Sequence, residues 1–181
     1  YGYIPTTYAA IAWGNFGGFE DDDYTLEMWI RTDDDSDTTY VYNTTCLMGH
    51  EPGQDLVANF NIWKGKVVFA HYGPQVSAAW QTTPTSTTDV SDDEWHHVVF
   101  VNHSNETGDI YIDGVAEATA VSTAIHTDPP TYIYAYHPDY IGLGYTNNYY
   151  DGDIAVCKIY DIALSADGVL QNYNALKGRF A

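Results

Sequence analysis

The sequence predicts an all-β fold, and three observations support this prediction. In the segment His96–Asn102, Val98 and Phe100 alternate with Val99 and Val101, so both faces can be buried, as in an inner strand of a two-sheet stack. Asp113-Gly114 is a dipeptide that tolerates the positive φ angles of a tight hairpin. Short strand-like segments recur along the chain with turn residues between them, which favours a sandwich or a barrel.

Each predicted strand is bounded by Gly, Pro or Asp residues that are typical of turns. Lys64-Gly65 predicts a compact hairpin between two of the strands. The predicted strands are Tyr24–Thr32, Tyr40–Tyr42, Cys46–Gly49, Val57–Trp63, Lys66–His71, His96–Asn102, Ile110–Ile112, Tyr132–Tyr136, Tyr140–Leu143 and Asp153–Tyr160.

One helix is predicted, over Ser165–Leu176. Ser165 suits the N-cap, and Leu164 with Val169 has the spacing of a hydrophobic staple. Gly178 is expected to end the helix, because glycine is common just past a helix C-terminus. The helix is expected to close one end of the sandwich.

The length of 181 residues fits one domain, 1–181, in which residues 1–20 form an N-terminal arm or an edge strand. No stretch approaches the roughly 20 apolar residues of a membrane span. Residue 1 is Tyr rather than Met, so we expect either a mature product or a chain that lacks its first residues.

The chain is strongly acidic, with 25 Asp and Glu against 6 Lys and Arg and a net charge of -19. Such a surface repels nucleic acid backbones and anionic lipid headgroups, so we expect neither nucleic acid binding nor membrane insertion. Two interpretations remain open. The charge is either an adaptation to saline water or, in part, a means of holding divalent cations. The candidate calcium ligands are Asp33, Asp35 and Asp37, although no ordered D-x-D-x-D-G loop is present.

Cys46 and Cys157 both lie in strand-like segments. They are either two buried free thiols or one disulfide between distant parts of the chain, which would need an oxidising location. Asn43, Asn102 and Asn105 begin N-glycosylation sequons, and the last two fall in a predicted turn after the Trp95 strand.

Several motifs resemble the laminin-G-like, concanavalin A-like jelly-roll superfamily. They are the pattern W-H-x-V-x-x-V from Trp95 followed by I-Y-I-D-G from Ile110, the strand Tyr24–Ile30 and the segment Tyr150–Ser165. The resemblance implies an antiparallel two-sheet jelly-roll sandwich with one short C-terminal helix. The segment Val169–Phe180 is also similar to the end of laminin-G-like domains in structural proteins of marine tailed phages.

The resemblance does not imply an enzyme. Glycanases of the superfamily carry two carboxylates on one strand as E-x-D-x-x-E, and this string is absent. Glu27 is the only Glu on a predicted strand, and Trp29 follows it two residues on. His96 and His97 are adjacent on a strand and therefore point to opposite faces, so they are not expected to share a metal ion.

Tyrosines and asparagines near the C-terminus are the candidate contact residues. Tyr132, Tyr134 and Tyr136 alternate with small apolar residues, so their rings share one face of a strand. Tyr145, Asn147, Asn148, Tyr149 and Tyr150 follow. Tyrosine suits sugar stacking or a protein interface, and an ordinary Tyr-rich sheet surface is the third interpretation.

The leading hypothesis is a non-catalytic structural or decoration module on the exterior of a virus particle, with a tailed phage favoured. Its partners would be copies of itself or other virion proteins. The alternatives are a secreted or cell-surface glycan-binding module, calcium-assisted or not, and a subunit of an extracellular filament. The expected location is therefore the virion surface or the extracellular space.

Overall fold

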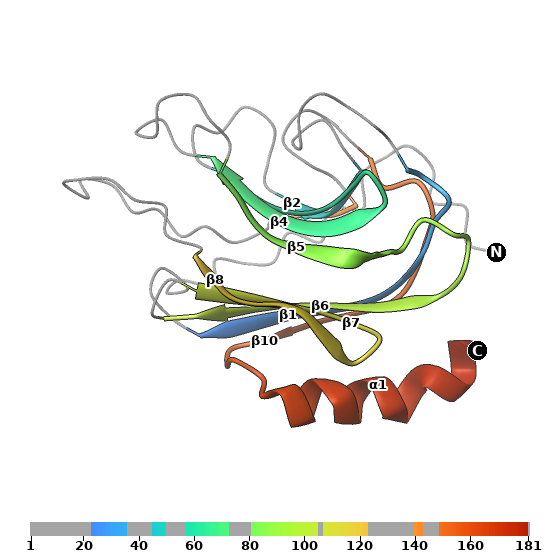
Figure 1. Ribbon diagram of the computed structural model, residues 1–181. Helices are drawn as coiled ribbons and strands as arrows, with labels where there is room; N and C mark the ends of the chain where they lie inside the picture. The colour runs from blue at the N-terminus through green and yellow to red at the C-terminus, as the bar shows by residue number, and fades with distance from the viewer. Residues whose placement is uncertain are drawn as a thin grey trace.

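A computed structural model of the chain describes residues 23–35, 45–49, 57–72, 81–104, 107–122, 140–142 and 149–180. Two sheets stack face to face, and one helix lies on the outer side of one of them (Figure 1). All the pairings between strands are antiparallel. The fold class predicted from the sequence is confirmed.

Within the described residues, each sheet has five strands. Sheet A has the order β10-β1-β6-β7-β8, and sheet B has the order β5-β4-β3-β2-β9. The elements are β1 (Tyr24–Arg31), β2 (Thr45–Gly49), β3 (Val57–Trp63), β4 (Lys66–Tyr72), β5 (Gln81–Asp89), β6 (His96–His103), β7 (Thr107–Ile112), β8 (Val115–Ser122), β9 (Tyr140–Ile141), β10 (Asp153–Tyr160) and α1 (Ala166–Phe180).

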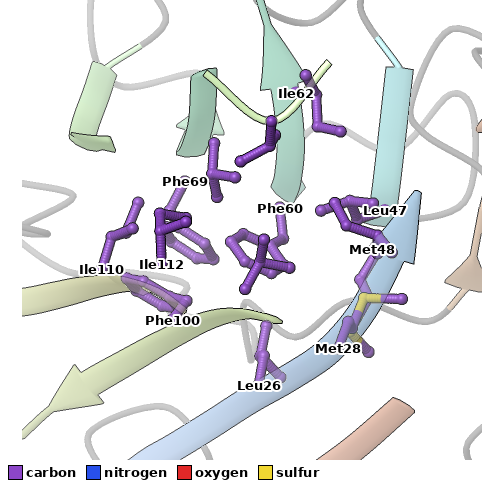
Figure 2. Close-up of a cluster of buried hydrophobic side chains, with 14 of the residues drawn as sticks. Leu26, Met28, Leu47, Met48, Phe60, Ile62, Phe69, Phe100, Ile110 and Ile112 are labelled. Atoms are coloured by element: carbon purple, nitrogen blue, oxygen red, sulfur yellow. The ribbon is translucent and has the colours of Figure 1, made fainter. Parts of the chain in front are cut away.

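The core lies between the sheets. Phe100 from sheet A stacks on Phe69 from sheet B with ring centroids 3.9 Å apart, and Figure 2 shows Phe60 beside them. On β6, Val98 and Phe100 enter this core, while Val99 and Val101 pack with Val169 of α1 on the other face. Both faces of β6 are therefore buried, as its alternating sequence predicts.

Two predicted hairpins are confirmed. Asp113 and Gly114 have φ angles of 52° and 78°, which is the geometry of a two-residue turn with positive φ at both positions. Lys64 and Gly65 have φ angles of 53° and 71° between β3 and β4. These turns fix the register of β7 with β8 and of β3 with β4.

Helix α1 begins where the sequence predicts. The backbone N–H of Gly168 donates to Ser165 Oγ at 3.2 Å, and Leu164 packs against the cluster that contains Val169. The expected stop at Gly178 is wrong, because the helix continues to Phe180. Phe180 stacks on Trp29 with ring centroids 4.4 Å apart, and this contact stabilises an additional turn of the helix. In the described part of the chain, no helix is long and apolar enough to cross a membrane.

The sequence missed β5 and β8, which form one edge of sheet B and one edge of sheet A. Glu117 of β8 joins these two edges. Its carboxylate accepts hydrogen bonds from the backbone N–H groups of Thr87 and Thr88, at 2.9 and 3.1 Å, and from both hydroxyls. Burial alone would raise the pKa of Glu117, but these donors outweigh it and lower the pKa to about 2. The sandwich is thus closed along one side by an ionised side chain.

The predicted strands Tyr40–Tyr42 and Tyr132–Tyr136 lie outside the described residues.

Candidate functional site

Three segments that are distant in sequence meet where β1 ends. They are the end of β1, the loop that precedes β6 and the segment that leads into β10. We call this surface the Arg31 corner. It comprises Arg31, Asp92, Asp93, Trp95, Tyr149, Tyr150 and Asp153.

Hydrogen bonds to the backbone hold the three segments together. Thr32 Oγ1 donates to the Asp151 carbonyl at 2.5 Å, and the Tyr150 hydroxyl donates to the Arg31 carbonyl at 2.9 Å. The backbone N–H of Asp93 donates to the Thr32 carbonyl at 3.0 Å. Gly152 permits this approach, because a Cβ there would lie 2.3 Å from the Arg31 carbonyl oxygen. The corner is therefore a fixed surface rather than a set of independent loops.

Arg31 is the cation of the corner. Its guanidinium lies 2.5 Å from Asp153 Oδ2 and 3.9 Å from Asp93 Oδ1, and it stands 5.4 Å from the centroid of the Trp95 ring. All three polar side chains are well exposed, so these ion pairs contribute little to stability. The three side chains can instead serve as hydrogen-bond donors and acceptors for a polar ligand.

The aromatic residues of the corner differ in exposure. Trp95 is half-buried against Phe180 with centroids 5.1 Å apart, whereas Tyr149 is 51% exposed. Burial raises the pKa of Tyr150, so its hydroxyl remains a protonated donor to the backbone. Tyr149 is thus accessible to solvent, and Tyr150 holds the segment in position.

His96 connects the corner to the hairpin at Asp113. Its Nδ1 lies 2.9 Å from Asp113 Oδ2, and its Nε2 lies 3.2 Å from Asp92 Oδ1. The hydrogen bond to Asp113 raises the pKa of His96, partial burial opposes this, and Asp92 adds to the increase. His97 lies on the opposite face, under α1, with no exposed surface. The two histidines therefore do not converge on one metal ion, as their adjacency predicts.

The comparisons with known proteins agree with this architecture. The family model for the concanavalin A-like lectin/glucanases superfamily matches residues 5–170. The chain belongs to this superfamily. None of the curated proteins compared with this concanavalin A-like domain matches it. No comparison tests the narrower resemblance to marine phage proteins, which stays a prediction.

Two solved structures illustrate the shared fold. Domain 4 of AbnA, a GH43 extracellular arabinanase from Geobacillus stearothermophilus in complex with arabinotriose, matches with a TM-score of 0.58 and 17% identity, over 83% of this chain and 66% of that one. The receptor binding domain of botulinum neurotoxin D matches with a TM-score of 0.55 and 15% identity, over 85% of this chain and 37% of that one. At these identities the likeness shows the shared fold alone.

Because the superfamily includes glucanases, the carboxylates on strands need a closer look. Glu27 is fully buried between sheet A and α1. Its oxygens lie 2.7 Å from Lys158 Nζ, 2.9 Å from the Tyr160 hydroxyl, 2.6 Å from Asn172 Nδ2 and 3.4 Å from His97 Nε2. Burial alone would raise the pKa of Glu27, but the nearby His97 ring and the hydrogen bonds from Lys158 and Tyr160 outweigh it and lower the pKa to about 2. A buried, permanently ionised carboxylate is suited to anchoring a helix and not to proton transfer with a glycan.

The interpretation of Glu27 as the only Glu on a strand is wrong, because Glu117 lies on β8. Glu117 also has a structural role, since its carboxylate accepts hydrogen bonds from Thr87 and Thr88.

The candidate contact residues divide into two groups. Tyr149 and Tyr150 lie in the Arg31 corner. The rest of the group, Tyr132, Tyr134, Tyr136, Tyr145, Asn147 and Asn148, lies outside the described residues. Sequence reasoning did not single out Arg31 or Trp95 as site residues. The available signals were that Arg31 is one of only 6 cationic Lys and Arg residues and that Trp95 begins the family motif.

The candidate metal ligands Asp33 and Asp35 are exposed just after β1, and Asp37 lies outside the described residues. Within the described ranges, no group of three or more His, Cys, Asp or Glu side chains is arranged to hold a metal ion. Calcium binding stays a prediction.

Cys46 and Cys157 are free thiols in different sheets, on β2 of sheet B and β10 of sheet A. Burial raises the pKa of both, that of Cys157 to about 11, so neither is an activated nucleophile. Of the sequon residues, Asn102 lies half-buried on β6 rather than in the turn after it, and Asn43 and Asn105 lie outside the described residues.

Proposed function

We propose that this chain is a non-catalytic glycan-binding module that acts in the extracellular space or at a cell surface, and that the Arg31 corner is part of its binding surface. The observation that carries the proposal is the corner itself. It brings together the Arg31 guanidinium, two exposed carboxylates and the Trp95 ring, and the exposed residue Tyr149 directly precedes Tyr150, whose hydroxyl holds this segment to the Arg31 backbone. A sugar ring needs this combination, because it presents an apolar face and a rim of hydroxyls.

Two further observations support the proposal. Membership of a lectin and glucanase superfamily makes carbohydrate a natural ligand class, and a domain of the same fold was solved with arabinotriose. Neither of the two Glu residues on the described strands is available to a glycan, since Glu27 is buried and the Glu117 carboxylate is bound by Thr87 and Thr88. These observations favour binding over hydrolysis.

A role as a virion decoration module or a filament subunit is not favoured by any of these observations. Both ideas stay predictions.

The test is calorimetry of the purified chain against a broad glycan panel that includes arabinotriose and longer arabino-oligosaccharides. Tyr149→Ala is expected to weaken binding about threefold to tenfold, because an aromatic contact contributes roughly 0.5–1.5 kcal/mol. Arg31→Gln is expected to weaken binding as well, since Gln keeps hydrogen-bonding atoms but loses the charge.

The matched control is Ile162→Ala, which removes another exposed apolar side chain, 53% exposed, away from the corner. It should bind like the parent chain. Flat titrations across the whole panel would reject glycan binding. Binding that is insensitive to both Tyr149→Ala and Arg31→Gln would move the site elsewhere on the domain.

A further inference from the structure

The outward face of α1 carries a charge pattern that is unusual on this molecule. Figure 1 shows α1 beneath sheet A as the outermost element of the described chain. Asp167 lies in its first turn, and Lys177 and Arg179 lie in its last turn. The chain has only 6 Lys and Arg residues against 25 Asp and Glu, and the end of α1 is one of two places, with Lys64 and Lys66, where two cations lie within three residues.

Four exposed residues form one line along this face, which we call the α1 stripe. They are Asp167, Leu170, Asn174 and Lys177. Their spacing of three, four and three residues keeps them on one side of an α-helix. The opposite side of α1 contacts sheet A through Val169, Asn172 and Phe180. The stripe is therefore held in a fixed orientation toward solvent.

The spacing of the α1 stripe is the same when it is read in either direction. When two such helices lie antiparallel about a two-fold axis, Asp167 of each copy lies opposite Lys177 of the other, and Leu170 lies opposite Asn174. Every contact then forms twice, which is the property of an isologous interface. An acid near the N-terminus and a base near the C-terminus also match the dipole of the helix that carries them.

We propose that the α1 stripe is a homodimer interface, in which two copies of this chain pair through antiparallel α1 helices. The charges of the α1 stripe complement those of the same stripe on a second copy, so a second copy is the partner that fits it. Most of the surface would repel another molecule of the same chain at a net charge of -19, whereas the stripe presents one carboxylate and one ammonium in self-complementary order.

Apolar surface at the stripe supports this pairing. Leu170 is 43% exposed, and Val115 on the neighbouring hairpin is 61% exposed. The hairpin adjoins the helix closely, because a Cβ added at Gly114 would lie 3.0 Å from Leu170 Cδ1. Gly178, one residue past Lys177, has no neighbour within 4 Å of the position of a Cβ, so the backbone of a partner can approach closely there. A helix of 15 residues is only about 22 Å long, and the interface is therefore smaller than the roughly 800 Å² per partner of a stable complex. The dimer is accordingly weak and sensitive to salt.

The test is sedimentation velocity of the full chain over a concentration series, with charge-swapped variants. The parent chain is expected to dimerise at low ionic strength and to become monomeric near about 1 M salt, where the Debye length falls to about 3 Å. Asp167→Lys and Lys177→Asp should each weaken dimerisation at least about tenfold, because each variant alone places like charges opposite one another twice.

Two combinations restore the opposite charges. The double variant Asp167→Lys/Lys177→Asp should dimerise like the parent, and an equimolar mixture of the two single variants should form a heterodimer. The control is Lys64→Asp, which changes the net charge as Lys177→Asp does but lies on the exposed hairpin between β3 and β4. It should leave dimerisation unchanged at matched ionic strength. Circular dichroism confirms that each variant keeps its fold.

A parent chain that stays monomeric across the concentration series would overturn the proposal. A mixture of the two single variants that stays monomeric while the parent dimerises would overturn it equally, because the dimer would then use another surface.

Discussion

Glu27 is fully buried between sheet A and α1, and its carboxylate depends on donors from β10 and from the helix. Glu27→Leu should lower the free energy of unfolding by about 3 kcal/mol, because it leaves the Lys158 ammonium without its acceptor and the Asn172 amide with the Tyr160 hydroxyl alone. We take the lower end of the usual range because the Lys158 side chain is 36% exposed and can reach water. Urea denaturation measures the change.

The control for Glu27→Leu is Glu94→Leu, at an exposed carboxylate, which should change the free energy of unfolding by no more than about 0.5 kcal/mol. Equal effects of the two substitutions would show that the network under α1 contributes nothing specific to stability.

His96 makes the stability of the corner depend on pH. Its folded-state pKa is raised above the ordinary value of 6.5 by Asp113 and Asp92. The stabilisation is therefore complete below pH 6.5 and is lost as the pH rises through the raised folded-state pKa. The melting temperature of the parent chain should fall relative to that of His96→Gln over this window. A constant difference between the two melting curves across the window would contradict the role of His96.

Among the elements, the sequence predicts the inner strands and the helix better than the edges. The range Val57–Trp63 agrees with β3, an inner strand of sheet B, because inner strands carry dense apolar residues. The range Asp153–Tyr160 agrees with β10, an edge strand of sheet A in which apolar residues predominate. The strand β5 was missed because it consists mostly of Thr with Pro84, and proline is tolerated only at an edge, where its missing N–H is not needed. The strand β8 was missed because its Ala residues give a weak apolar signal.

The contact between these two edges can be tested directly. Glu117→Ala should lower the free energy of unfolding by about 1 kcal/mol, a value reduced because the site is partly exposed. Hydrogen exchange should accelerate at the Thr87 and Thr88 amides, which lose their acceptor. Glu94→Ala serves as the control at a carboxylate that is exposed on the loop before β6. Unchanged exchange at Thr87 and Thr88 would show that Glu117 does not hold the edges together.

At the scale of the whole molecule, the candidate site is the feature that could not be predicted from the sequence. Arg31, Trp95 and Tyr150 are far apart in the chain, and only the order of strands in sheet A brings β1 between β6 and β10. Because Phe180 lies under Trp95, an antiparallel pair of α1 helices would place two Arg31 corners at opposite ends of the dimer. A pair of weak sites can then bind a long or clustered ligand more tightly than one site can.

The net charge of -19 has a consequence for the whole fold. Raising NaCl from about 0.01 M to about 1 M shortens the Debye length from about 30 Å to about 3 Å and screens repulsion among exposed carboxylates. The melting temperature should rise by roughly 3–6 °C, the equivalent of about 1–2 kcal/mol for a chain of this length. Differential scanning calorimetry at fixed pH measures this rise.

Neutralising the exposed residues Asp33, Asp35 and Asp161 by substitution with Asn should raise the melting temperature at low salt and reduce its response to salt. A melting temperature that falls with salt would mean that attractive pairs, such as Arg31 with Asp153, outweigh repulsion in this molecule.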